Sequence, residues 1–246
     1  MSDTDRSITA WSQTLDTLLD LGDGFTDDHW AAPTECPGWT VKDVYSHLIG
    51  GEDWMAQGHP APAEGLARIA DVPVAARRDR TGREVLAELR QVYAQRLRQL
   101  VDNPPDPDVM TQTAFLLPVT VGVLLRMRAF DLWVHEQDVR RAIGKPGGMD
   151  SPAAQHTADY LSESLGLVVA RRVGAPAGTT VVLDLEGSEP VAFGVNESGR
   201  GERLADPPGE PTVRLSMDRE SFILLAGGRR APDPGAIRID GDDHLG

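Results

Sequence analysis

The sequence predicts an α+β protein in which a four-helix bundle over residues 1–147 precedes a small α+β domain over residues 148–246. Three observations predict this fold class. Four segments before residue 145 repeat apolar residues at helical spacing. A breaker cluster follows, Gly144-Lys145-Pro146-Gly147-Gly148. Short alternating runs come after it, and strands mixed with segregated helices are typical of a small α+β domain.

The first two predicted helices are defined by their apolar faces and by their ends. Residues 5–21 form the first helix, which Gly22 and Gly24 end. Its apolar face consists of Ile8, Trp11, Leu15, Leu18 and Leu19. The second helix opens at Thr40, whose hydroxyl can cap it while Asp43 reaches back as the third residue of a capping box. It continues to Met55.

The remaining elements follow in order. A third helix is predicted over residues 81–101, before Asn103-Pro104-Pro105, and a fourth over residues 119–143. Beyond the breaker cluster, Ser151-Pro152 starts a helix predicted to run to residue 172. The predicted strands are residues 179–185, 190–195, 212–216 and 236–239, with a short helix over 219–225.

Composition limits the class of protein. The 246 residues carry a formal net charge of −14, which disfavours a nucleic-acid partner because phosphate backbones repel such a surface. The single cysteine, Cys36, excludes an internal disulfide. The first residues lack a signal peptide pattern, and the longest apolar stretch, residues 119–125, is far shorter than the ~20 residues of a membrane helix. We therefore expect a cytoplasmic protein without a membrane segment.

The fourth helix carries the pattern that suggests chemistry. At ~100° per residue, Asp131 and His135 fall within its wide apolar arc, only ~40° apart. Burying an unpaired charge is costly, and the i, i+4 spacing lets both side chains converge on one metal ion. The alternative is a buried Asp–His hydrogen bond with the histidine packed in the core. Asp138 is a candidate second partner of His135 or an alternative ligand.

A third candidate ligand lies on the second helix. His47 sits at the edge of the apolar face of that helix. If the second and fourth helices face each other, it completes a His/Asp/His set with an open coordination position, as in catalytic zinc sites. Otherwise it is a core or surface histidine. The other histidines are weaker candidates: His29 and His59 are expected in loops, His156 on a helix surface and His244 at the tail.

Cys36 raises two hypotheses. It lies between Glu35 and Pro37, in the loop that enters the second helix, with no histidine near it in sequence. A catalytic nucleophile is one hypothesis. Packing beside Trp39 is the other, and we favour it.

Two stretches carry a family resemblance. Residues 30–48, W-A-A-P-T-E-C-P-G-W-T-V-K-D-V-Y-S-H-L, resemble the signature of the mycothiol-dependent maleylpyruvate isomerase family, which belongs to the DinB-like metal-binding four-helix bundles. Residues 128–144, R-A-F-D-L-W-V-H-E-Q-D-V-R-R-A-I-G, fall where that family carries a carboxylate-x-x-x-His pair. The C-terminal part resembles a sterol-carrier-like α+β domain.

The resemblance implies a metal, a thiol and an arginine. It implies zinc, or another divalent metal, at His47, Asp131 and His135, with mycothiol as the thiol cosubstrate in the open position. The isomerase itself looks to have a glutamate where this chain has Asp131, which shortens the ligand. The family's late arginine corresponds to Arg229 or Arg230 in L-L-A-G-G-R-R, residues 224–230, although two solvated arginines in a turn are an equal alternative.

Two functions follow from the resemblance. The first is an enzyme, a thiol transferase or cis-trans isomerase, in which the metal-bound thiolate adds to a small electrophile. The arginine-rich, lysine-poor composition fits an actinobacterial host, where mycothiol is the usual thiol. The second is a non-catalytic metal-containing protein that binds a ligand or mediates dimerisation. The electrophile, the native metal and the choice between monomer and homodimer stay open.

Overall fold

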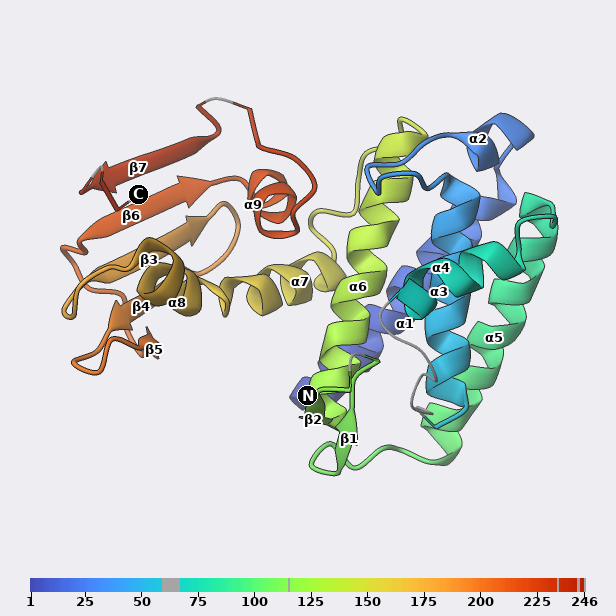
Figure 1. The fold of residues 1–246 in the computed structure, drawn as a ribbon, viewed down its shortest axis with the longest axis horizontal. Helices are drawn as coiled ribbons and strands as arrows, with labels where there is room; N and C mark the ends of the chain where they lie inside the picture. Colours follow the sequence, from blue (N-terminus) through green and yellow to red (C-terminus); the bar gives the residue numbers. More distant parts are fainter. Residues whose placement is uncertain (59–66, 115, 234, 243, 246) are drawn as a thin grey trace. The chain divides into compact units, whose positions relative to one another are not determined.

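The chain divides into two compact units. A computed structural model describes residues 1–58, 67–114, 116–233, 235–242 and 244–245. The units are Met1–Gly148 and Met149–Gly246, a division one residue beyond the predicted boundary (Figure 1). The first is helical, and the second is α+β with a five-stranded mixed sheet, so the predicted fold class is confirmed.

Four long helices build the first unit. They are α1 (Asp3–Asp23), α3 (Val41–Ala56), α5 (Gly82–Asp102) and α6 (Val121–Ala142). Helix α1 packs along α6, α3 packs along α5, and α3 also contacts α6 (Figure 1). The side chains buried between them are mainly leucines and aromatics, among them Leu15, Leu18, Tyr45, Leu48, Leu89, Leu132 and Trp133. Burial of this apolar surface supplies most of the stability of such helices.

The predicted capping box of α3 is present. The backbone N–H of Asp43 donates to Thr40 Oγ1, and the Thr40 N–H donates to Asp43 Oδ2 at 2.9 Å. This reciprocal pair fixes where α3 begins. The start in turn sets the helical phase that directs His47 toward α6.

Several short elements of the first unit were not predicted. They are α2 (Asp27–Ala31), α4 (Ala67–Ala76) and a hairpin of β1 (Met110–Gln112) and β2 (Pro118–Thr120). All are too short for a clear periodicity, and α4 contains Pro73. The expectation that His29 lies in a loop is wrong, because His29 is in α2 and its Nδ1 accepts the Thr26 N–H. His59 lies outside the described residues.

The second unit is built on a five-stranded sheet. Its strands are β3 (Thr180–Leu185), β4 (Val191–Val195), β5 (Gly201–Leu204), β6 (Val213–Met217) and β7 (Ile237–Gly241), in the order β5-β4-β3-β6-β7. The β3–β6 pair is parallel, and the other pairs are antiparallel. Helices α7 (Pro152–Ser162) and α9 (Arg219–Ala226) contact each other.

The single helix predicted over residues 151–172 is wrong. The observed helix, α7, ends at Ser162, and a short helix α8 (Leu165–Leu167) and a π-helical turn (Val168–Val173) follow. Near the break, the hydroxyls of Ser162 and Ser164 donate to carbonyls three residues earlier. Gly166 then packs closely on Phe193 and Gly201. Packing against the sheet therefore overrides the helical pattern.

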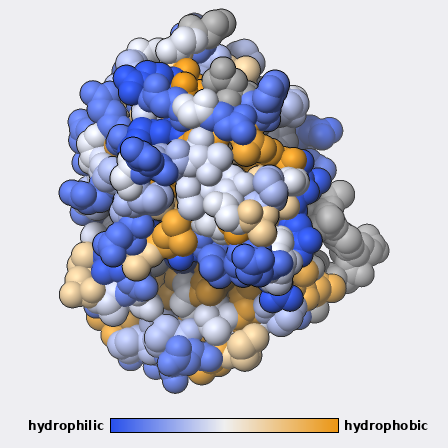
Figure 2. Space-filling view, turned by 90° about the vertical axis from the view of Figure 1, so that its left-hand side faces the viewer, coloured by the Kyte–Doolittle hydropathy of each residue, from blue (hydrophilic) through white to orange (hydrophobic). Residues whose placement is uncertain are grey.

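The face of the molecule drawn in Figure 2 is mostly polar. On the face shown in Figure 2, hydrophilic residues predominate and apolar residues form small separate groups. Among the described helices, none combines the length and the apolar character needed to cross a bilayer.

Candidate metal centre

The structure brings the three predicted ligands together. His47 Nε2 lies 3.7 Å from Asp131 Oδ2, and His135 Nε2 lies 3.7 Å from Asp131 Oδ1. The three ligand atoms all lie within 4.8 Å of one another. Nitrogen and oxygen ligands about 2.1 Å from a tetrahedral zinc ion are roughly 3.4 Å apart. Small inward movements would therefore seat an ion, and the two imidazoles with one carboxylate suit zinc.

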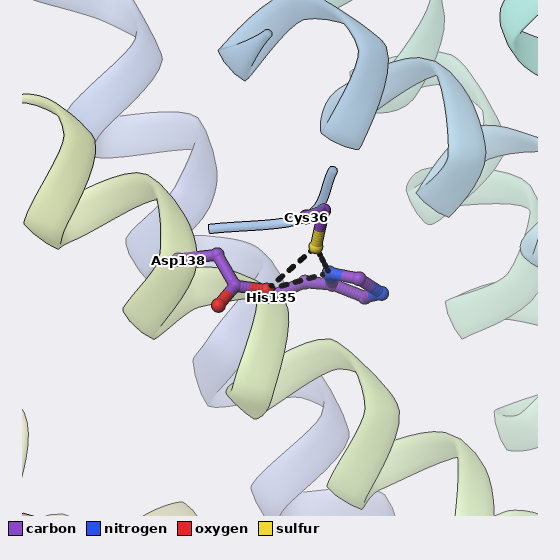
Figure 3. A group of neighbouring side chains, drawn as sticks. All are labelled: Cys36, His135 and Asp138. Atoms are coloured by element: carbon purple, nitrogen blue, oxygen red, sulfur yellow. Dashed lines mark hydrogen bonds and ion pairs between the residues drawn. The ribbon is translucent and has the colours of Figure 1, made fainter. Parts of the chain in front are cut away.

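A carboxylate fixes the orientation of His135. Nδ1 of its ring lies 3.0 Å from Asp138 Oδ2, and the Cys36 thiol donates to the same oxygen at 3.2 Å (Figure 3). The other oxygen of Asp138 accepts from Arg141, whose Nε donates to Glu35 at 2.7 Å. Metal-binding histidines commonly have such a carboxylate on the second ring nitrogen. With Nδ1 engaged, Nε2 is the nitrogen that faces Asp131.

Cys36, His135 and Asp138 also form a group that could hold a metal ion by itself. Cys36 is half-buried, and its Sγ lies 3.8 Å from His135 Nδ1. The sequence indicated no histidine near Cys36, because His135 is 99 positions away. The Cys36 contact with Asp138 is equally remote in sequence, so only the packing of the entry loop of α3 on α6 reveals it.

The charge of Asp131 is balanced by a side chain that the sequence did not single out. Arg128 NH1 donates to Asp131 Oδ2, and its Nε donates to Glu52 Oε1 at 3.0 Å. Glu52 is fully buried on α3. Gly51 makes room for this approach, since a Cβ there would lie 2.6 Å from the guanidinium carbon. Although burial opposes ionisation of Asp131, Arg128 and the two histidines hold the pKa of Asp131 well below its usual range.

The two histidines differ in their protonation. Burial lowers the pKa of His47, which favours the neutral ring that a metal requires. Burial acts in the same direction on His135, but the hydrogen bonds with Asp138 and Cys36 and the charge of Asp131 outweigh it and raise the pKa of His135 to about 9. A metal ion at Nε2 must therefore displace a proton. The Trp39 ring lies beside both imidazoles, 5.1 Å from the centroid of His47 and 6.2 Å from that of His135.

A pocket of about 220 Å³ adjoins His47 and Asp131. Its other lining residues come from α3, from the segment after β1 and from α6, and most are apolar: Gly51, Trp54, Thr113, Ala114, Leu124, Met127, Arg128 and Phe130. The candidate ligands thus lie at a cavity that a small molecule can enter.

Arg229 and Arg230 lie in the second unit, on the turn after α9. The Arg229 guanidinium is half-buried and donates to the Gly227 carbonyl oxygen at 3.0 Å, whereas Arg230 is exposed. Their role at the metal centre stays a prediction.

The fold and the site together define a two-domain protein: a helical domain with a candidate metal centre, followed by an α+β domain. Residues 11–140 match the mycothiol maleylpyruvate isomerase N-terminal domain, and residues 155–246 match the C-terminal domain of the same family. The chain belongs to this family, which confirms the resemblance seen in the sequence.

Solved structures share the fold. The crystal structure of the mycothiol-dependent maleylpyruvate isomerase matches with a TM-score of 0.63 and 16% identity, covering 98% of this chain and 93% of that one. A histidine-to-alanine mutant of that enzyme matches with a TM-score of 0.61, the same identity and the same coverage. At this identity the likeness extends to the fold alone.

Curated relatives are more similar over a shorter length. Uncharacterized proteins of two Mycobacterium tuberculosis strains, CDC 1551 and H37Rv, are each 28% identical over 130 residues. The matched region covers 52% of this chain and 62% of the length of either relative.

Proposed function

We propose that this chain is a metal-dependent enzyme in which a low-molecular-weight thiol, mycothiol, adds to a small electrophile. Zinc, or another divalent ion, would be held by His47, Asp131 and His135. The observation that carries this proposal is the convergence of three ligand atoms beside a pocket. Membership of the family supports it.

The geometry favours an open coordination position. Asp138, an alternative ligand by its place in the sequence, lies on the Nδ1 side of the His135 ring, whereas the cluster is formed by Nε2. A fourth protein ligand would close the coordination position. The two ring nitrogens point in diverging directions, so one ion cannot reach both Asp138 and the Nε2 cluster. Among the described residues, the cluster consists of three protein groups, which leaves room for a thiol.

The residues around the site would each have a defined task. When bound, zinc would lower the pKa of a coordinated thiol and so hold a strong nucleophile at neutral pH. Asp138 keeps Nε2 of His135 directed at the cluster, and Arg128 keeps Asp131 ionised. The pocket beside His47 would place the electrophilic carbon within reach of the sulfur.

The chemistry balances without a further reactant. The thiolate sulfur bonds to an alkene carbon conjugated to a carbonyl, and the alkene electron pair moves to the carbonyl oxygen as an enolate. Expulsion of the sulfur after bond rotation returns the thiolate and isomerises the alkene. Protonation of the enolate carbon instead gives a thioether, which is S-transfer. In this proposal Arg229 or Arg230 attracts a substrate carboxylate or the polar groups of the thiol.

Cobalt substitution tests the open position. A low-molecular-weight thiol added to the cobalt-loaded protein should change its visible spectrum, since sulfur would enter the coordination sphere. His47→Ala, treated in parallel, should bind less cobalt and give no such change. A cobalt spectrum that thiol leaves unaltered would favour the alternative, a non-catalytic metal-containing protein that binds a ligand or mediates dimerisation.

A further inference from the structure

The walls of the pocket beside the metal centre are apolar. Trp54 of α3 and Met127 and Phe130 of α6 are half-buried side chains that line it, and Leu124 is buried at its wall. Half-buried large apolar side chains around a cavity remain partly in contact with water. An apolar ligand would remove that surface from water, which stabilises the complex.

The cationic side chain at this pocket is already neutralised. Arg128 is the one arginine among the described residues that line the pocket. Each of its three guanidinium nitrogens has a hydrogen-bond partner. Nε donates to Glu52 at 3.0 Å, NH1 donates to Asp131, and NH2 donates to the Leu48 carbonyl oxygen at 3.3 Å. Its side chain is only 10% exposed. A ligand carboxylate would thus compete with Glu52 and Asp131 for Arg128.

The volume sets the size of the ligand. A dry, engineered apolar cavity of about 150 Å³ binds benzene. The pocket here measures about 220 Å³, which suits one ring with a short substituent. His47 and Asp131 at its wall would place that substituent beside the metal centre.

We propose that this pocket takes an uncharged, single-ring part of the electrophile, an aryl or cycloalkyl group attached to an alkene with a conjugated carbonyl, and that it does not take a carboxylate group. This inference rests on the proposed function for the reacting position, whereas the preference for an uncharged group comes from the pocket itself. Selectivity arises because a carboxylate among the apolar walls loses its hydration, while the arginine of the described lining is already paired with other groups.

A matched pair of ligands tests the preference. Methyl cinnamate and the cinnamate anion share ring and alkene and differ in charge. Binding of each to the metal-free full-length protein at pH 7 is measured by calorimetry, so that zinc cannot coordinate the carboxylate. We expect methyl cinnamate to bind at least about tenfold more tightly. Equal affinity, tighter binding of the anion, or no binding of the ester would overturn the proposal.

Two variants and a control locate the ligand. Met127→Glu should weaken the binding of methyl cinnamate at least about tenfold, because it places a carboxylate in the pocket. Met127→Lys should instead strengthen the binding of the cinnamate anion. Val123→Glu introduces the same charge at an exposed position of α6, outside the pocket lining, and should change neither affinity more than about twofold. Circular dichroism checks that all three fold. Equal effects of Met127→Glu and Val123→Glu would overturn the assignment to this pocket.

The same preparations separate the two proposals. If zinc binds and thiol alters the cobalt spectrum while the ester shows no preference, the pocket inference fails and the proposed function stands. If the ester binds and Met127→Glu abolishes binding, but no metal is taken up, the apolar pocket stands and the metal-dependent function fails.

Discussion

Replacing Asp138 by asparagine tests whether this carboxylate prepares His135 for a metal. The substitution Asp138→Asn keeps the size of the side chain and removes its charge. Asp138 is fully buried, one oxygen lies 3.0 Å from His135 Nδ1, and the other accepts from Arg141 at 3.0 Å. Loss of such an outer partner typically weakens metal binding roughly 10- to 100-fold, or about 1.4 to 3 kcal/mol.

The assay is zinc affinity measured by competition with a chromophoric chelator. Glu136→Gln is the matched control, because Glu136 is a buried carboxylate of the same helix that pairs with Arg140 at 2.6 Å instead of His135. We expect Asp138→Asn to lose at least about tenfold in affinity and Glu136→Gln less than about threefold. Similar losses in the two variants would refute the idea that Asp138 acts through His135.

Three further predictions concern stability. The pKa of His135 is raised from 6.5 to about 9. The stability that its charged form contributes is therefore complete below pH 6.5 and is lost as the pH rises through 9. Urea unfolding of the zinc-free protein should show that the free energy of unfolding decreases by about 3 kcal/mol between these two pH values. Tyr45→Phe should cost about 1 kcal/mol, since the buried hydroxyl donates to the Leu18 carbonyl oxygen at 2.6 Å. Glu52→Gln should destabilise by about 3 kcal/mol or more, because it leaves the charge of Arg128 without its buried partner.

Each of these has a contradicting result. Stability of the zinc-free protein that is constant or rising between pH 6.5 and pH 9 would contradict the charged form of His135. A Tyr45→Phe variant as stable as the parent would show that its hydroxyl bond contributes nothing. If the free energy of unfolding of Glu52→Gln falls by less than about 1 kcal/mol, other groups balance the charge of Arg128.

The helical framework was predictable because its signals are local. Thr40 and Asp43 form a capping box three residues apart, and the apolar face of α1 repeats along the helix. Asp131 and His135 lie one turn apart on one helix, so their approach follows from helical geometry alone. The strand β5 was missed because Gly201–Leu204 carries Glu202 and Arg203 as exposed residues and shows no apolar alternation.

The surroundings of the site were less accessible from sequence. The contact between Cys36 and Asp138 joins residues 102 positions apart, and no local pattern encodes it. The pairing of Arg128 with Glu52 spans 76 positions. A signal did exist for Glu52, because it lies four residues after Leu48 on the buried face of α3, where a carboxylate needs a partner. The partner itself depended on how α3 packs on α6.

Metal content of the purified protein tests the central claim most directly. Elemental analysis is made without an affinity tag, after zinc reconstitution and removal of excess metal, beside the His47→Ala variant. We predict about one zinc per chain, lost in His47→Ala while helicity by circular dichroism is retained, because helix packing and not the ion supplies most of the stability. A chain that holds no zinc, or a His47→Ala variant that holds as much as the parent, would contradict the His47, Asp131 and His135 site.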